Sequence, residues 1–233
     1  MKLNCRKCDK ETDLEIESSS ICSSCLEIRT RKTFIKYMSK GLDTKRHKIA
    51  KTTRIRIMVA YNKSLASVCC EKLIKEYTLP QIEEILYCGL HVDYNHPKFI
   101  SIQKEMDLEM AILDTAYKHD CNVILYCHDS HHLASKLLTR VVLGKAKGIE
   151  VFENGCTTAY KDKEFKIIYP FQNCYFNELL NYASIHHLPF LPTKSTTSTD
   201  FYDITKNFLL LQEKEKSSTC STINRTLAKV NTL

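Results

Sequence analysis

The sequence contains little glycine and little proline, with five residues of each among 233. This scarcity excludes a collagen-like chain and a chain that is disordered throughout. No run approaches the roughly eighteen apolar residues that a membrane-spanning helix needs. The first eight residues also lack the apolar segment of a secretory signal. We therefore expect a cytoplasmic protein with no membrane partner.

Apolar residues and cysteine, in contrast, are abundant. Hydrophobic residues make up 43% of the chain and charged residues 26%, which is enough for a buried core and a solvated surface. At this length we expect one α/β domain with a smaller appendage. Twelve cysteines without a secretory signal indicate a reducing compartment, in which thiols bind metals or take part in thiol chemistry rather than form disulfides.

Positive charge is concentrated near the N-terminus. The chain has a formal net charge of +7, but residues 29–56 alone contain eleven Lys or Arg and a single acid, Asp43. Such a concentration favours a polyanionic ligand, and phosphate backbones are the commonest polyanion. A solvated basic helix is the alternative, and Phe34, Tyr37 and Met38 indicate that part of the stretch packs on the body as an amphipathic helix. The candidate RNA-binding residues are Arg29, Arg31, Lys32, Lys36, Lys40, Lys45, Arg46, Lys48, Lys51 and Arg54.

The rest of the chain alternates strand and helix patterns. Short apolar runs predict strands at 55–60, 85–92, 122–127 and 165–169. Apolar residues at helical spacing predict helices that begin near Leu65 and Ile102, and others at 132–142, 174–187 and 201–215. This order predicts an α/β fold with a doubly wound, mostly parallel sheet, which binds ligands at the carboxyl ends of its strands.

Four cysteines near the start form two Cys-x-x-Cys pairs, Cys5 with Cys8 and Cys22 with Cys25. Two such pairs on tight turns can complete a tetrahedron around one metal ion. Residues 1–28 contain few apolar side chains, so metal binding would supply folding free energy that burial alone cannot. We predict structural zinc, because four thiolates leave no open position for a substrate. Disulfides are the alternative, and the reducing compartment argues against them.

The turn after the first strand is where a nucleotide-binding α/β protein holds a phosphate. It reads Asn62-Lys63-Ser64-Leu65-Ala66-Ser67 and has no glycine, although close approach to a phosphate and a positive φ usually need one. After the third strand the chain reads Cys127-His128-Asp129-Ser130-His131-His132-Leu133-Ala134. Further on stand the segments 144–148 and 168–171, followed by Glu178 and Tyr182.

Together with the paired cysteines and the basic stretch, these motifs resemble the cytoplasmic tRNA 2-thiolation protein 2 family over residues 5–187. The resemblance implies a sheet domain similar to the PP-loop ATP pyrophosphatases, or adenine nucleotide alpha hydrolases. Those proteins carry Ser-Gly-Gly-x-Asp-Ser and Gly-His-Asn-x-Asp-Asp-x-Ala at the matching positions. Ser67 and His128 match these motifs, whereas Lys63 replaces a glycine, and Ala66, His131 and His132 replace acids.

These departures imply a degenerate nucleotide loop without catalytic residues, because Mg²⁺ needs oxygen ligands that the replaced acids would have supplied. The residues of this loop are Asn62, Lys63, Ser64, Ser67, His128 and Asp129. The implied organisation is a zinc-binding module at 1–28, a basic and partly helical connector at 29–54, a degenerate PP-loop domain at 55–215 and a flexible tail at 216–233.

The family implies a non-catalytic subunit of the cytosolic tRNA thiolase, required for 2-thiolation of wobble uridine 34 in Lys, Glu and Gln tRNAs. The implied partners are tRNA, a catalytic subunit that is a paralogue with an intact loop, and a ubiquitin-related modifier that carries sulfur. We expect no ATP hydrolysis by this chain. One alternative is an ATP-dependent uridine thiolase active by itself, since Lys63 could hold a phosphate. Another is a zinc-ribbon adaptor that binds only proteins.

Two weaker candidates remain in the sheet domain. His128, His131 and His132 could form a second metal site, but three ligands within five residues seldom converge, so we interpret them as part of the degenerate loop. A persulfide or iron–sulfur site could involve Cys127, Cys156 and Cys174. The apolar context of Cys127 favours a core role for it.

Overall fold

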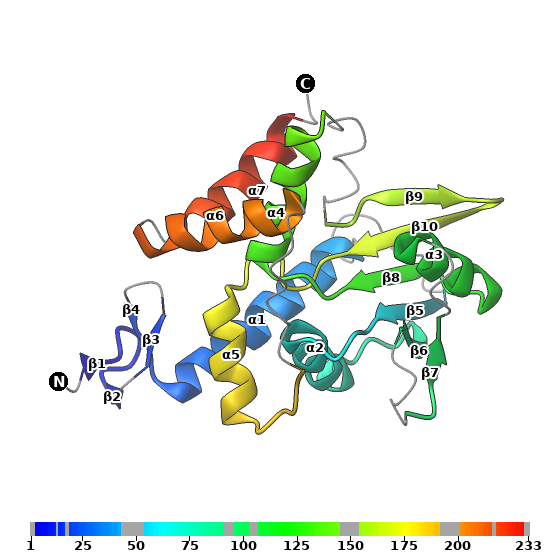
Figure 1. Cartoon of the computed structure of the whole chain (residues 1–233). Helices are drawn as coiled ribbons and strands as arrows, with labels where there is room; N and C mark the ends of the chain where they lie inside the picture. The colour runs from blue at the N-terminus through cyan, green and yellow to red at the C-terminus, as the bar shows by residue number, and fades with distance from the viewer. Residues whose placement is uncertain are drawn as a thin grey trace.

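The computed structural model describes residues 3–12, 14–16, 19–42, 54–90, 96–102, 107–144, 154–191, 201–215 and 218–230. Within these ranges the centre is a six-stranded sheet in the order β7-β6-β5-β8-β10-β9 (Figure 1). Every neighbouring pair is parallel except β9 with β10. The strands are β5 (Ile55–Ala60), β6 (Ile82–Gly89), β7 (Phe99–Ser101), β8 (Val123–Tyr126), β9 (Thr157–Tyr160) and β10 (Lys163–Ile168).

Helices cover both faces of this sheet (Figure 1). On one face lie α1 (Ser23–Gly41), α2 (Leu65–Glu76) and α5 (Phe176–Ile185), and on the other lie α3 (Leu108–Lys118) and α4 (Ser130–Val142). The first core includes Phe34 from α1, Val59 from β5 and Leu179 from α5. The second includes Met58 and Ile124, which point to the opposite face because side chains alternate along a strand.

The C-terminal end of α1 packs tightly on the sheet. A Cβ atom added to Gly41 would lie 2.8 Å from Cγ1 of Ile168 on β10, so a larger residue would push the helix away. At the other end of α1, Cys22 is the residue before the helix, and Cys25 lies in its first turn. The same helix therefore connects the cysteine pairs to the sheet, and it crosses the boundary predicted at residue 28.

The N-terminal residues form two small hairpins with little apolar content. β1 (Leu3–Asn4) pairs with β2 (Glu11–Thr12), and β3 (Glu15–Ile16) pairs with β4 (Ser19–Ser20). Their core consists of the five buried residues Cys5, Ile16, Ile21, Cys22 and Leu26. Two-residue strands over so small a core need a further source of stability.

The predicted α/β fold with a mostly parallel sheet is confirmed, with local differences at one helix and one edge strand. The helix predicted from Ile102 begins at Leu108, because Asp107 caps it by accepting a hydrogen bond from the Glu109 N–H (2.8 Å). The edge strand β9 was not predicted, since its four residues alternate between exposed and half-buried positions. The helix predicted at 201–215 is α6 (Phe201–Glu215).

The expectation of a flexible tail is wrong for Thr219–Val230, which form α7. Its Ser- and Thr-rich composition conceals an amphipathic pattern, in which Cys220 and Asn224 are buried and Ile223 is partly buried. α6 and α7 pack together on the outer side of α4 (Figure 1). Of the helices that the structure describes, none is both long and apolar enough to cross a membrane.

Candidate functional site

The four cysteines predicted to bind a metal converge in the structure. One ligand atom from each of Cys5, Cys8, Cys22 and Cys25 lies within 4.8 Å of the others, and the Sγ atoms of Cys8 and Cys22 are 3.5 Å apart. The turn after β1 also directs the Lys7 N–H toward the Cys5 sulfur (3.4 Å). Cys22 and Cys25 are positioned by the start of α1. Among the described residues this is the one group of three or more potential metal ligands, so His128, His131 and His132 form no second site.

The arrangement of the sulfur atoms fits one tetrahedral ion. Zn–S bonds of about 2.3 Å place neighbouring sulfurs about 3.8 Å apart, so only small shifts of the sulfur atoms are needed. All four ligands are thiols, which is the donor set of a closed structural site. The group could therefore bind a metal, and a bound ion would hold the two hairpins and the start of α1 together.

The basic residues of α1 form an exposed ridge. Lys32, Lys36 and Lys40 recur every fourth residue and are exposed, on the side away from the buried Phe34 and Met38. Among the residues that the structure describes, no carboxylate lies within ion-pair distance of these three lysines. We call Lys32, Lys36 and Lys40 the basic ridge; its charge is available to a polyanion.

The other candidate RNA-binding residues differ in their surroundings. Arg31 lies 3.7 Å from Glu76, and the exposed Arg54 lies 3.3 Å from Glu83, so acids partly neutralise both. Arg29 lies 3.5 Å from the buried carboxylate of Glu178, which also accepts a hydrogen bond from the Thr30 hydroxyl (3.2 Å). Lys45, Arg46, Lys48 and Lys51 lie outside the described residues.

The degenerate loop lies where the sequence placed it, between β5 and α2. Lys63 has a φ of 55°, so a lysine adopts the left-handed conformation that usually selects glycine. That conformation costs a non-glycine residue about 1–2 kcal/mol. The Lys63 carbonyl accepts a hydrogen bond from the Leu191 N–H (2.9 Å), which places the segment after α5 against the loop.

Side chains of the loop already bond two of the amide groups at the start of α2. The Ser64 N–H donates to Oδ1 of Asn62 (3.1 Å), and the Ser67 N–H donates to Oγ of Ser64 (3.4 Å). The Ser67 hydroxyl in turn donates to the Ser64 carbonyl (2.9 Å). A phosphate at the start of α2 would have to displace these internal bonds.

His128 and Asp129 lie at the same edge of the sheet as the loop, because β8 is the parallel neighbour of β5. The Asp129 carboxylate caps α4 by accepting a hydrogen bond from the His132 N–H (2.7 Å), and burial raises its pKa. His128 stacks on His132 with ring centroids 4.1 Å apart, and burial lowers its pKa well below the usual range. The Asp129 carboxylate is therefore engaged as the cap of α4, and the His128 imidazole is neutral.

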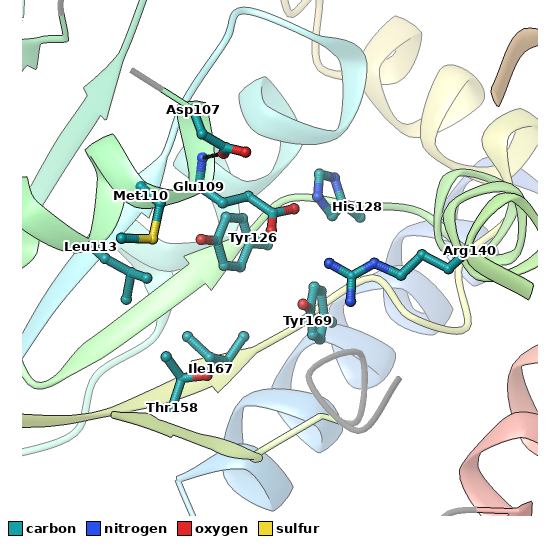
Figure 2. A pocket seen from close by; sticks show the side chains of 10 residues that line it. All are labelled: Asp107, Glu109, Met110, Leu113, Tyr126, His128, Arg140, Thr158, Ile167 and Tyr169. Carbon is teal, nitrogen blue, oxygen red and sulfur yellow. Dashed lines mark hydrogen bonds between the residues drawn. The ribbon is translucent and has the colours of Figure 1, made fainter. Parts of the chain in front are cut away.

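A cavity of about 320 Å³ opens beside His128, between α3, α4 and the ends of β8 and β10 (Figure 2). Apolar side chains line one part, and Tyr126, His128 and Tyr169 line another. Arg140 and the acids Asp107 and Glu109 supply its charged groups. Sequence reasoning singled out only His128 here. The usable signal was that Tyr126 and Tyr169 end or follow parallel strands, which is where such sheets bind ligands.

The buried histidines of α4 predict a loss of stability in weak acid. Burial lowers the pKa of His131 to about 4 and that of His132 to about 3, below the ordinary value of 6.5. Between pH 6.5 and pH 5 the unfolded chain binds protons that the folded chain does not, so stability falls by about 2 kcal/mol for each histidine. The urea midpoint measured at pH 7 and pH 5 checks this. His131→Gln should reduce the loss of stability between pH 7 and pH 5, whereas His187→Gln, at an exposed position, should leave that loss unchanged. An equal loss in both variants would show that the buried His131 does not cause it.

Comparison with solved structures defines the class of the fold. The chain superposes on the U34-tRNA thiolase NcsA from Methanococcus maripaludis, solved with its [4Fe-4S] cluster, with a TM-score of 0.73. The match covers 97% of this chain and 86% of that one at 14% sequence identity. The chain thus shares the α/β fold of this thiolase structure.

Sequence comparison points to a particular group of proteins. The chain is 30% identical over 130 residues to the Cytoplasmic tRNA 2-thiolation protein 2 of Scheffersomyces stipitis, and 28% identical over 123 residues to that of Debaryomyces hansenii. These matches cover 52% and 49% of this chain, but only 29% and 28% of the relatives. No protein-family model matches. The resemblance predicted from the sequence is confirmed by these relatives.

Proposed function

We propose that this protein is a non-catalytic subunit of a cytoplasmic tRNA 2-thiolation complex. In this role it binds tRNA and a catalytic paralogue with an intact PP-loop, and supports 2-thiolation of wobble uridine 34 in Lys, Glu and Gln tRNAs. The names of the relatives support the process and the location. A ubiquitin-related modifier would bring the sulfur to the complex.

The observation that carries the non-catalytic role is the state of the loop. The amide groups of Ser64 and Ser67 are bonded by the side chains of Asn62 and Ser64, and Lys63 occupies the left-handed position. The carboxylate of Asp129 is engaged as a helix cap, so it is not free to hold Mg²⁺. Activation of ATP would then fall to the partner, and this chain would contribute RNA binding through the basic ridge and the cysteine module.

We further propose that the metal in the cysteine module is zinc. The NcsA structure contains a [4Fe-4S] cluster, which is the competing possibility. In such a cluster each cysteine binds a different iron, so four thiols would lie farther apart than around a single ion. Sulfur atoms within 4.8 Å of one another favour the single ion.

Measuring ATP consumption tests the proposal that the catalytic paralogue, and not this chain, activates ATP. We expect the isolated chain with tRNA to release no AMP or pyrophosphate above background, and the mixture with the catalytic paralogue to release both. Ser64→Ala removes the cap of α2 and should cost about 1 kcal/mol of stability. It should leave turnover of the mixture within about twofold at a temperature where the variant is folded, because no reacting group is lost. Steady ATP turnover by this chain alone, abolished by Ser64→Ala, would identify an enzyme instead.

A further inference from the structure

We propose that the cavity lined by Tyr126, His128 and Tyr169 binds one unpaired nucleobase of the RNA. The proposal rests on the proposed function only in taking the base from RNA. The cavity lies on the α3 and α4 side of the sheet, whereas the degenerate loop leads into α2 on the other side. The cavity therefore shares His128 with the degenerate loop but lies on the opposite face of the sheet from α2.

The three rings provide a surface for stacking. Their centroids are separated by 5.7 Å (Tyr126–His128), 5.8 Å (Tyr126–Tyr169) and 6.1 Å (His128–Tyr169), and their planes differ by only 16–22°. Three rings in one column would place the outer two about twice as far apart as neighbours. Three nearly equal distances instead place the rings at the corners of a triangle, offset from one another, and all three contribute to one wall of the cavity. A planar heterocycle gains stacking energy on such a surface, whichever base it is.

The charges in the cavity favour an uncharged ligand. Asp107 is engaged as the cap of α3, and Glu109 forms an ion pair with Lys136 (3.0 Å). Arg140 adds one positive charge, so these four side chains balance. His128 is neutral, because burial lowers its pKa. A phosphate would meet two carboxylates without a surplus of positive charge, whereas a base is neutral.

The polar groups are also of the kinds that a base edge requires. Figure 2 shows the Arg140 guanidinium and the Glu109 carboxylate directed toward the space beside the rings. The guanidinium only donates hydrogen bonds and the carboxylate only accepts them, and the edge of a base presents both acceptors and donors. Met110, Leu113 and Ile167 line the remainder with apolar surface. A volume of about 320 Å³ is at the lower end of the range for small-molecule sites, which suits one base with part of its ribose.

Titration of the whole chain with small probes tests this proposal. Aromatic NMR signals of Tyr126, His128 and Tyr169 are followed during addition of uridine, adenosine or ribose 5-phosphate. We expect saturable shifts with both nucleosides and none with ribose 5-phosphate. Shifts with ribose 5-phosphate alone would reveal an anion site, and the absence of shifts with all three would reveal no site; either result overturns the proposal.

Variants locate the binding and identify the source of the base. Arg140→Gln and Glu109→Gln should each weaken nucleoside binding roughly fivefold or more, because each removes a hydrogen-bonding group. Arg225→Gln, at an exposed position on α7, should leave it unchanged. A single-stranded RNA hexamer should shift the same signals at concentrations at least about tenfold lower than uridine, since the phosphates add contacts outside the cavity. Tighter binding of ATP than of the hexamer would show a free-nucleotide site and overturn the proposal.

The outcome is separable from that of the proposed function. If nucleosides bind but Arg140→Gln has no effect on tRNA thiolation, the cavity binds a base but does not contribute to thiolation. Conversely, if tRNA binds without shifting the signals of Tyr126, His128 and Tyr169, the chain binds RNA but the cavity does not hold a base.

Discussion

Replacing Cys5 and Cys22 by serine is expected to unfold the N-terminal module and abolish metal binding. Each pair then loses one thiolate, and two ligands cannot hold the ion in place of four. Structural zinc contributes on the order of 10–16 kcal/mol in small zinc-binding peptides. The two-residue strands and five buried side chains of this module cannot replace so large a contribution.

The expected result has a chemical and a structural readout. Elemental analysis should find one zinc per wild-type chain and none in the double variant, and wild-type protein purified without oxygen should lack the visible absorption of an iron–sulfur cluster. Amide hydrogen exchange should become fast over residues 3–26 and remain slow in β5 and β8. Cys156→Ser changes a half-buried thiol elsewhere in the chain and should retain the zinc.

Loss of the module should also weaken tRNA binding, because α1 begins at the metal site. Cys22 precedes this helix and Cys25 lies in its first turn, so the ion orients the start of the helix that carries the basic ridge. Iron with visible absorption in the wild-type protein would contradict zinc. Normal tRNA affinity in the double variant would show that the module lies outside the RNA-binding surface.

The local parts of the site were predictable from the sequence. The spacing of the cysteine pairs predicted their convergence, because each pair occupies one tight turn. The position of Asn62–Ser67 after an apolar strand likewise predicted the loop at the edge of the sheet. These features depend on residues that are neighbours in the chain, and a short stretch of sequence therefore contains the whole signal.

The aromatic cavity was not predictable in the same way. Tyr126 ends β8, Tyr169 follows β10, and Arg140 lies in the last turn of α4. No spacing relates these three residues, and only the order of the strands brings them together. The same is true of α7, whose buried Cys220 and Asn224 are stabilised by contact with α4 rather than by local propensity.

Reversing the charge of the basic ridge is expected to reduce both the affinity for tRNA and its dependence on salt. The triple substitution Lys32→Glu, Lys36→Glu and Lys40→Glu changes three exposed side chains that face away from the core of α1. Each phosphate contact that is lost lowers the slope of log affinity against log salt concentration by nearly one. We therefore expect a slope smaller by about 2–3 and an affinity about 100-fold lower at low salt.

A second triple variant with the same change in net charge tests whether the position of the lysines or the overall charge determines tRNA affinity. Lys98→Glu, Lys118→Glu and Lys161→Glu change the chain by the same six units, but these lysines lie beside acids near β7, at the end of α3 and in the β9–β10 turn. If tRNA binds through the ridge, the control should lose much less affinity, and its slope should remain close to that of the wild type. Filter binding at a series of salt concentrations measures both quantities. Equal losses in the two triple variants would mean that overall charge drives binding, and an unchanged slope in the ridge variant would place the phosphate contacts on another surface.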